Sequence, residues 1–272
     1  MKNYFIPNIN DFKTKIGEHN FNNKIILEIG SDMELCVAQE FIKQGAKKVI
    51  CVNPKFPDKL ISPNEKIVLI KDFGENTHLA SNSFDYIFGI ALIEHVINLS
   101  ELMQEVKRLL KIDGCAFLQG NPIYTSPNGH HLWVKTDTTH YTFYNENNPF
   151  RPWEHLSLKT ESELIKNLEQ KHIKKEHLPF LVNYLLSNDT SKYSTSQIIS
   201  SIKQVCKNNV IIYEKQTKVN KNKYYYEALK FYNDKDLKTE GLTFLYASKL
   251  SRLKIFYKKI KKLFLHIKIT NF

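Results

Sequence analysis

The stretch that most constrains this chain is residues 24–53. The apolar run 25–29 carries an acid, Glu28, and is followed by a glycine, which is typical of a buried parallel strand. Apolar side chains recur at helical spacing over 33–44, and a second apolar strand is expected over 49–52. A strand, a tight turn, a helix and a strand form a βαβ unit, whose first turn directs backbone N–H groups at a ligand above the strand ends.

Composition is consistent with a folded enzyme-sized domain. The 272 residues are 42% hydrophobic, enough to bury a full core in one elaborated domain or one domain with a small appendage. No apolar run reaches the roughly 18 residues of a membrane span, and the N-terminus lacks the apolar core of a secretory signal. The four cysteines are far apart and form no CxxC pair. We therefore expect a cytoplasmic protein with reduced thiols.

The net charge of +11 is concentrated at the C-terminal end. Residues 249–268 contain eight Lys or Arg residues and no acid, so the rest of the chain carries only +3. A nearly neutral body argues against a nucleic-acid partner. Residues 249–272 are predicted to form a basic amphipathic helix. Two interpretations of this helix stay open: packing with a solvated lysine face, which we favour, and peripheral contact with an anionic membrane at its inner face.

The chain continues with strands and helices in alternation, as an α/β sheet requires. An acid and an aromatic residue, Asp72 and Phe73, follow the third expected strand. Further helical patterns precede two late apolar strands. The expected strands are 66–70, 83–90, 115–119, 210–213 and 241–247, and the expected helices are 100–110, 161–172, 175–186 and 196–206.

Several of these segments resemble the class I S-adenosylmethionine-dependent methyltransferases. Glu28 and Gly30 match the acid and first glycine of the family's first motif. The FD pair 84–85, the run ALIEHV at 91–96 and the LLKIDG turn at 109–114 match its most recognisable block. The resemblance implies a Rossmann-like fold, with a doubly wound, mostly parallel seven-stranded sheet and an inserted loop and helical region after the fifth strand.

The same resemblance implies S-adenosylmethionine as cofactor and assigns residues to it. An acid after the third strand bonds the adenine amino group in the family, and the EH pair helps to frame the pocket. The implied cofactor-binding residues are Glu28, Gly30, Ser31, Asn53, Asp72, Phe73, Gly89 and His95. Asp32, Glu34 and Asn53 depart from the family pattern, which keeps a non-catalytic, degenerate subunit open as an alternative.

The segment 120–157 is expected to form the acceptor site. It is a long loop that starts where open α/β sheets place their ligands, and its many aromatic residues argue for order. Asn128-Gly129 is a strong turn signal. His130 and His131 follow it directly, and histidine is the side chain best suited to remove a hydroxyl proton near neutral pH. We expect one of these two as catalytic base and Tyr124, Trp133, His140 and Tyr141 as substrate-binding residues.

A metal site in this loop is a weaker alternative. His130, His131, Asp137 and His140 offer ligand atoms, but their spacing follows no established pattern. Our expectation is therefore a site without a metal.

The motif SPNGHHLW at 126–133 resembles loops in bacterial surface-glycan methyltransferases. It implies O-methylation of a cell-surface glycan or its nucleotide-activated precursor, and more narrowly of the phosphoramidate group of some capsules. An RNA-modifying methyltransferase is the other alternative. The oligomeric state is not predicted. The expected units are an arm (1–23), the cofactor core (24–120), a substrate loop with a helical insert (121–208), the last core strands (209–248) and the tail (249–272).

Overall fold

Seven strands form one sheet in the computed structural model, which describes residues 2–248. Their order is β3-β2-β1-β4-β5-β9-β8, in which β1 to β5 run parallel and β9 runs antiparallel to both of its neighbours. The predicted α/β fold class is confirmed. The strands are β1 Ile25–Ile29, β2 Lys48–Val52, β3 Ile67–Ile70, β4 Phe84–Gly89, β5 Leu110–Gly120, β8 Val210–Gln216 and β9 Thr239–Ala247.

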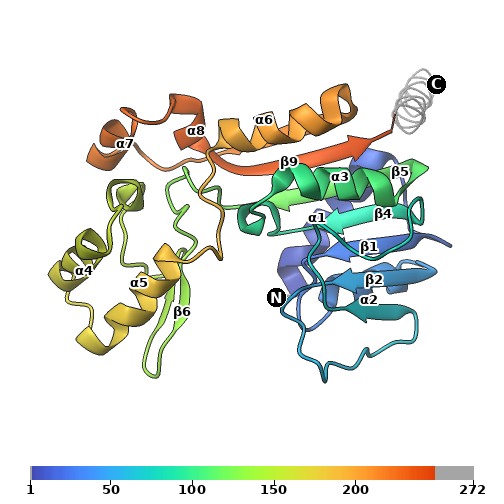
Figure 1. Cartoon of the computed structure of the whole chain (residues 1–272), viewed down its shortest axis with the longest axis horizontal. Coiled ribbons are helices and arrows are strands. Elements are labelled where there is room, and N and C mark those ends of the chain that lie inside the picture. Colours follow the sequence, from blue (N-terminus) through green and yellow to red (C-terminus); the bar gives the residue numbers. More distant parts are fainter. Residues whose placement is uncertain (1, 249–272) are drawn as a thin grey trace, which may run out of the picture.

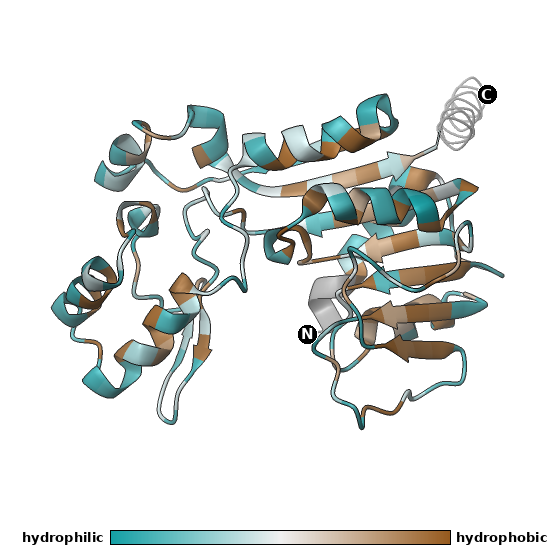
Figure 2. Cartoon of the chain, in the orientation of Figure 1, coloured by the Kyte–Doolittle hydropathy of each residue, from teal (hydrophilic) through white to brown (hydrophobic). Residues whose placement is uncertain are grey.

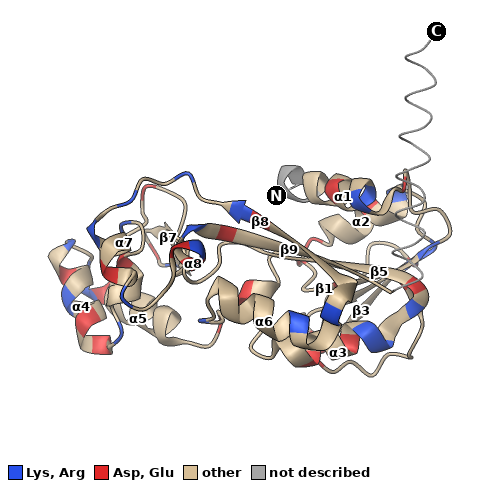
Figure 3. Cartoon of the chain, turned by 90° about the horizontal axis from the view of Figure 1, so that it is seen from above, with Lys and Arg blue, Asp and Glu red and all other residues tan. Residues whose placement is uncertain are grey.

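Helices cover both faces of this sheet (Figures 1 and 3). The helices α1 (Lys2–Ile16) and α2 (Cys36–Lys43) pack on one face, and α3 (Leu99–Leu109) and α6 (Thr195–Cys206) pack on the other. Each helix presents one apolar stripe to the sheet, which is how an amphipathic helix buries its nonpolar surface. The predicted N-terminal arm is thus mainly a helix laid against the sheet.

The two faces have different cores because side chains alternate along each strand. Leu27 and Ile29 of β1 join the core under α3 and α6, whereas Ile26 joins the core under α1 and α2. Aromatic rings dominate the second core, where Phe12 contacts the rings of Phe21, Tyr86, Phe88 and Phe117. Hydrophobic residues, drawn in brown, are concentrated along the strands of the sheet (Figure 2).

A second lobe lies beside the sheet, beyond the carboxyl end of β5 (Figure 1). Two separate segments build it: one follows β5 and the other connects β8 to β9. A small apolar core and an aromatic cluster around Trp153 hold the lobe together. Its elements are β6 Trp133–Lys135, β7 His140–Thr142, η2 Glu154–Ser157, α4 Glu161–Gln170, η3 Lys175–His177, α5 Leu178–Leu186, α7 Lys223–Ala228 and α8 Asp234–Lys238.

The structure differs in three places from the division of the chain expected from the sequence. The long loop after β5 contains the antiparallel pair β6-β7. Helix α6, expected in the insert, packs on α3 and belongs to the sheet layers. The region 209–248, expected to hold only core strands, also contains α7 and α8, which pack with η2 and α6 respectively.

The predicted basic helix over 249–272 lies outside the described residues. In the part of the chain that is described, no helix has both the length and the apolar character needed to cross a membrane. Basic and acidic residues are interspersed along the ribbon of this part of the chain (Figure 3).

Candidate active site

Hydrogen bonds made by the backbone and by Asp32 fix the turn after β1. Gly30 has φ +78°, a left-handed conformation that favours glycine, and its N–H donates to the Val52 carbonyl at 2.8 Å. The Asp32 carboxylate accepts from the N–H groups of Glu34 at 2.8 Å and Cys36 at 3.1 Å. Helix α2 therefore begins at Cys36, three residues later than expected. Since a carboxylate already occupies the start of the helix, a phosphate group would be repelled there.

Glu28 lies buried at the carboxyl end of β1, with 4% of its surface exposed. The Cys51 thiol donates to its Oε2 at 3.6 Å. Burial, and secondarily the nearby Asp32 charge, raises the pKa of Glu28 to about 8. The Ser31 hydroxyl donates to the Glu28 carbonyl at 3.2 Å, which fixes the turn above it.

Asn53, at the end of β2, holds the turn in place. Its Nδ2 donates to the Ser31 carbonyl at 2.8 Å, and its Oδ1 accepts from the Lys55 N–H at 2.8 Å. The asparagine therefore ties the end of β2 to the turn after β1. Its Oδ1 keeps a lone pair that can accept a further hydrogen bond, such as one from a ribose hydroxyl.

Asp72 and Phe73 follow β3, on the same edge of the sheet. The Asp72 carboxylate accepts from the Phe73 N–H at 2.8 Å and lies 3.2 Å from His78 Nδ1. Phe73 is 64% exposed, so its ring face is open to a ligand. At the end of β4, a Cβ on Gly89 would lie 2.6 Å from the Leu92 side chain and 3.2 Å from the Ile29 carbonyl. Only glycine allows this close approach of β1, β4 and Leu92.

These residues fit the adenosyl and amino acid parts of S-adenosylmethionine. Acids and amides stand at the carboxyl ends of neighbouring parallel strands. The sheet order reverses between β1 and β4, where open α/β sheets bind ligands. The capped start of α2 suits a cofactor that carries no phosphate.

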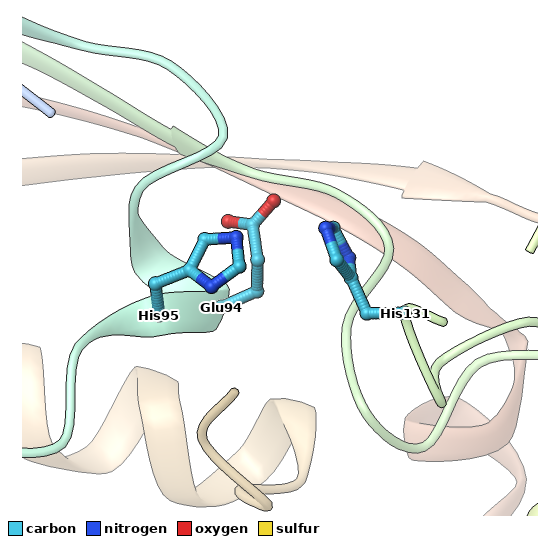
Figure 4. Close-up of side chains that lie close together, drawn as sticks. All are labelled: Glu94, His95 and His131. Carbon is cyan, nitrogen blue, oxygen red and sulfur yellow. The ribbon is translucent and has the colours of Figure 1, made fainter. Parts of the chain in front are cut away.

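A group of three side chains lies just beyond β4. Glu94 and His95 come from η1 (Ile93–His95), and His131 comes from the second lobe. One ligand-type atom from each lies within 4.8 Å of those of the other two. The rings of His95 and His131 have centroids 4.8 Å apart and are nearly perpendicular. Figure 4 shows the three side chains converging from η1 and from the loop after β5.

Backbone contacts anchor Glu94 and His95. Glu94 is 3% exposed, its Oε1 accepts from the Asn121 N–H at 3.1 Å, and its buried Oε2 has no hydrogen-bond partner among the described residues. His95 Nδ1 lies 2.6 Å from the Asp189 carbonyl, to which it must donate because a carbonyl can only accept. Burial raises the pKa of Glu94 to about 8 and lowers the pKa of His95.

His131 is held in a constrained position. Its φ is +50°, its ring stacks on Phe143 with centroids 4.7 Å apart, and the Tyr184 hydroxyl donates to its carbonyl at 2.8 Å. The ring Nδ1 is buried and has no partner in the part of the chain that is described. Burial, and secondarily His95, lowers the pKa of His131 to about 3, so that its ring is neutral at pH 7.

Comparison with known proteins agrees with this architecture. Residues 35–118, from the turn before α2 to β5, match the model of a family described as a methyltransferase domain. The chain contains a methyltransferase domain. The predicted enzyme class, a methyltransferase dependent on S-adenosylmethionine, is confirmed at this level, and so is the predicted cofactor. A search of curated proteins found no match.

Solved structures with a similar fold cover most of the chain. One is phosphoethanolamine N-methyltransferase 2 from Haemonchus contortus, with 12% identity and a TM-score of 0.50 over 89% of this chain and 52% of that one. Another is an S-adenosylmethionine-dependent methyltransferase from Mesorhizobium loti, with 13% identity, a TM-score of 0.48 and coverage of 84% and 93%. A geranyl diphosphate C-methyltransferase from Streptomyces coelicolor shares 9% identity, with a TM-score of 0.46 and coverage of 88% and 77%. At 12% identity and a TM-score of 0.50, the likeness to the first of these structures shows the fold alone.

The expectation that the turn presents both histidines is wrong for His130. The turn forms, with His131 N–H donating to the Asn128 carbonyl at 3.2 Å. His130, however, is only 4% exposed, and its ring packs against Phe150 and His155 inside the second lobe. Burial holds the pKa of His130 well below its usual value. Only His131 faces the methyltransferase domain.

The expected substrate-binding residues also divide into two groups. Tyr141 is buried and its hydroxyl bonds His177 Nδ1 at 2.8 Å, while Tyr124 packs against the cluster around Trp153. Both therefore pack within the lobe, contrary to expectation. Trp133 is 49% exposed and contacts the half-buried His140, with ring centroids 5.0 Å apart. These two remain available to an acceptor.

Sequence reasoning missed Glu94, Phe143 and Tyr144. Glu94 is the acid of the expected EH pair, and an acid inside an otherwise apolar run was the available signal. Phe143 stacks on His131, and Tyr144 lies next to it with 63% of its surface exposed.

Gly129 is the residue that allows the turn to place His131. A Cβ there would lie 2.0 Å from the Tyr124 carbonyl oxygen and 2.4 Å from that of Ile123, so the backbone must move. We expect Gly129→Ala to lower the free energy of unfolding by about 1–3 kcal/mol, measured by urea denaturation. Glu146→Ala, at an exposed site in the same lobe, is the control, with an expected change within about 0.5 kcal/mol. Equal stability of the two variants would contradict this role.

Proposed function

We propose that this protein methylates a hydroxyl oxygen of a carbohydrate acceptor, such as a bacterial cell-surface glycan or its nucleotide-activated precursor. The phosphoramidate group of a capsular polysaccharide is a narrower form of the same proposal. One observation carries it: His131 of the second lobe faces His95 of the methyltransferase domain beyond the end of β4. The acceptor would therefore lie between the two lobes.

The chemistry requires little beyond alignment and proton removal. When bound, S-adenosylmethionine supplies the methyl group for an in-line displacement. The protein must hold the acceptor oxygen about 3 Å from the methyl carbon and aligned with the breaking bond. His131 is the residue that we assign to the acceptor hydroxyl, because its neutral ring can accept a hydrogen bond and its Nδ1 has no partner among the described residues.

A line of aromatic rings supports a carbohydrate acceptor. It runs from His131 through Phe143 and Tyr144 to Trp133, with neighbouring centroids 4.7, 5.2 and 5.6 Å apart. Tyr144 and Trp133 are exposed. Aromatic side chains with an apolar face and a polar tip suit the alternating C–H and hydroxyl surfaces of a sugar ring. This line gives an acceptor a platform that leads to His131.

On the cofactor side, the proposal gives each residue a task. Glu28 and the Gly30 turn, closed by Ser31 and Asn53, hold the amino acid and ribose end. Asp72 accepts from the adenine amino group, and Phe73 covers the base. Gly89 allows the close approach of β4, and His95 closes the pocket from η1.

Calorimetric titration with S-adenosylhomocysteine tests the cofactor half. We expect micromolar binding by the wild type, weakened about tenfold to hundredfold in Glu28→Gln and in Asp72→Ala, because each variant loses a carboxyl group that bonds the ligand. Asp58→Asn is the control, since Asp58 is an exposed acid whose carboxylate pairs with Lys71.

The outcomes separate the proposal from its rival. Binding that weakens in both variants but not in the control supports a working cofactor site and justifies a screen of glycans and nucleotide sugars as acceptors. No binding by the wild type would contradict the proposal and favour the non-catalytic subunit.

A further inference from the structure

We propose that Glu94, His95 and His131 together bind a divalent transition-metal cation. Binding of the cation does not depend on the proposed function. The role of the cation does rest on that function: the cation would hold and activate the acceptor hydroxyl. His131 would then act on the hydroxyl as a metal ligand rather than as a free base. This set of ligands differs from the one considered from the sequence.

Ligand-type atoms of the three side chains converge at this site. One ligand-type atom from each of the three side chains falls within 4.8 Å of the others. Only 3% of the surface of Glu94 is exposed, and its Oε2 has no hydrogen-bond partner among the described residues. The same is true of the buried Nδ1 of His131. Buried polar atoms are nearly always paired or coordinate a metal, so the unpaired carboxylate oxygen of Glu94, in a group with two imidazoles, points to a ligand.

Hydrogen bonds to the backbone orient Glu94 and His95. Metal-binding histidines usually donate their other ring N–H to a carbonyl or carboxylate, and metal-binding carboxylates are themselves hydrogen-bonded. His95 Nδ1–H donates to the Asp189 carbonyl at 2.6 Å, which leaves Nε2 with its lone pair. Glu94 Oε1 accepts from the Asn121 N–H at 3.1 Å, which leaves Oε2 free. Both side chains are thus oriented as ligands.

The donor set defines the class of cation. Two imidazoles and one carboxylate suit Zn²⁺ and other first-row divalent transition metals, whereas Mg²⁺ and Ca²⁺ prefer oxygen ligands only. Three protein ligands leave a coordination position open for an acceptor oxygen. Such an oxygen would lose its proton to solvent water more readily, as a water molecule does on Zn²⁺.

The sequence-based alternative of His130, His131, Asp137 and His140 does not come together in the fold. Asp137 Oδ1 lies 3.3 Å from His177 Nε2, and His130 is buried against Phe150 and His155. Within the described residues, the only group of three His, Cys, Asp or Glu side chains arranged to hold a metal is the one around Glu94.

Metal retention by the full chain tests the inference. The protein is equilibrated with Zn²⁺, freed of excess metal by gel filtration and analysed for zinc by mass spectrometry; Co²⁺ is titrated in parallel and followed by its visible absorption. We expect one equivalent of Zn²⁺ in the wild type and at least tenfold weaker Co²⁺ binding in Glu94→Gln and His131→Asn. Glu94→Gln is the sharper variant, because glutamine keeps the shape and hydrogen-bonding capacity of the side chain but not its charge.

His140→Gln is the matched control for metal content, because His140 belongs to the sequence-based set but not to this one. Retention of zinc by the control, with loss in Glu94→Gln, supports the inference. No zinc in the wild type, or equal retention in all variants, would overturn it and leave an adventitious ion only. Far-ultraviolet circular dichroism on each sample shows whether a variant lost metal merely by failing to fold.

The same samples separate this inference from the proposed function. S-adenosylhomocysteine binding without zinc retention would leave the methyltransferase assignment standing and remove the metal. Zinc retention without S-adenosylhomocysteine binding would do the reverse. Added Zn²⁺ should also raise the unfolding temperature of the wild type but not of Glu94→Gln, because a ligand stabilises only the state that binds it.

Discussion

Glu28→Gln is expected to stabilise the cofactor-free protein by about 3 kcal/mol at pH 7, although it weakens cofactor binding. The fold raises the pKa of Glu28 from 4.5 to about 8, chiefly by burial. A carboxyl group with a raised pKa binds its proton more tightly in the folded state, so its contribution to stability falls as pH rises from about 4.5 to 8. Glutamine stays neutral at every pH, so the variant does not lose this stability as pH rises.

The pH dependence is the decisive part of this prediction. Urea unfolding of wild type and Glu28→Gln should differ by about 3 kcal/mol at pH 7 and by less than about 1 kcal/mol at pH 5, where the unfolded carboxyl also begins to bind a proton. Glu34→Gln makes the same chemical change at an exposed position of the same turn and should alter stability by no more than about 0.5 kcal/mol. A Glu28→Gln effect of equal size at both pH values would disprove the account.

Glu154→Leu is expected to destabilise the second lobe by about 3–5 kcal/mol. Glu154 is 2% exposed, and its carboxylate accepts from Lys171 Nζ at 2.7 Å, from Asn167 at 2.9 Å and from the Tyr224 hydroxyl at 3.0 Å. Removing the acid leaves the half-buried Lys171 ammonium without its counter-charge. Because these partners lie on α4, directly after α4 and on α7, the change should loosen both segments of the lobe.

Hydrogen exchange followed by mass spectrometry measures where the loss falls. Peptides from α4 and α7 should lose protection in Glu154→Leu, while peptides from β1 and β4 keep theirs. Glu176→Gln is the control, because Glu176 is exposed and lies 4.0 Å from Lys174, a separation at which a surface pair contributes little. Unchanged protection of α4 would show that Glu154 does not hold the lobe.

The sheet could be predicted from the sequence because its strands are continuous apolar runs that alternate with amphipathic helices. Every expected core strand lies within a few residues of an observed one. The start of α2 was displaced because Asp32 accepts bonds from the N–H groups of Glu34 and Cys36, so the helix starts after this loop. Local patterns fix elements well but fix their ends less closely.

The candidate site could be predicted only in part, since a turn signal does not say which way a ring points. Adjacent histidines can face opposite sides, and His130 packs into the lobe while His131 faces His95. Asn53 was expected to bind the cofactor, but in the structure its side chain also joins the turn to the end of β2. The position of Glu94 against His131 depends on packing between segments 37 residues apart, which no local pattern encodes.

The origin of the second lobe in two separate segments limits how its specificity can be transferred. A chimera that exchanges only the segment after β5 would replace the residues that pack against α7. Tyr224 would then lose its hydrogen bond to Glu154. Both segments must therefore be transferred together for the lobe to keep its fold. The first segment leaves the sheet at β5, and the second leaves it at β8 and returns at β9. A sheet with these attachment points can carry a different acceptor-binding lobe only when both segments are exchanged as a pair.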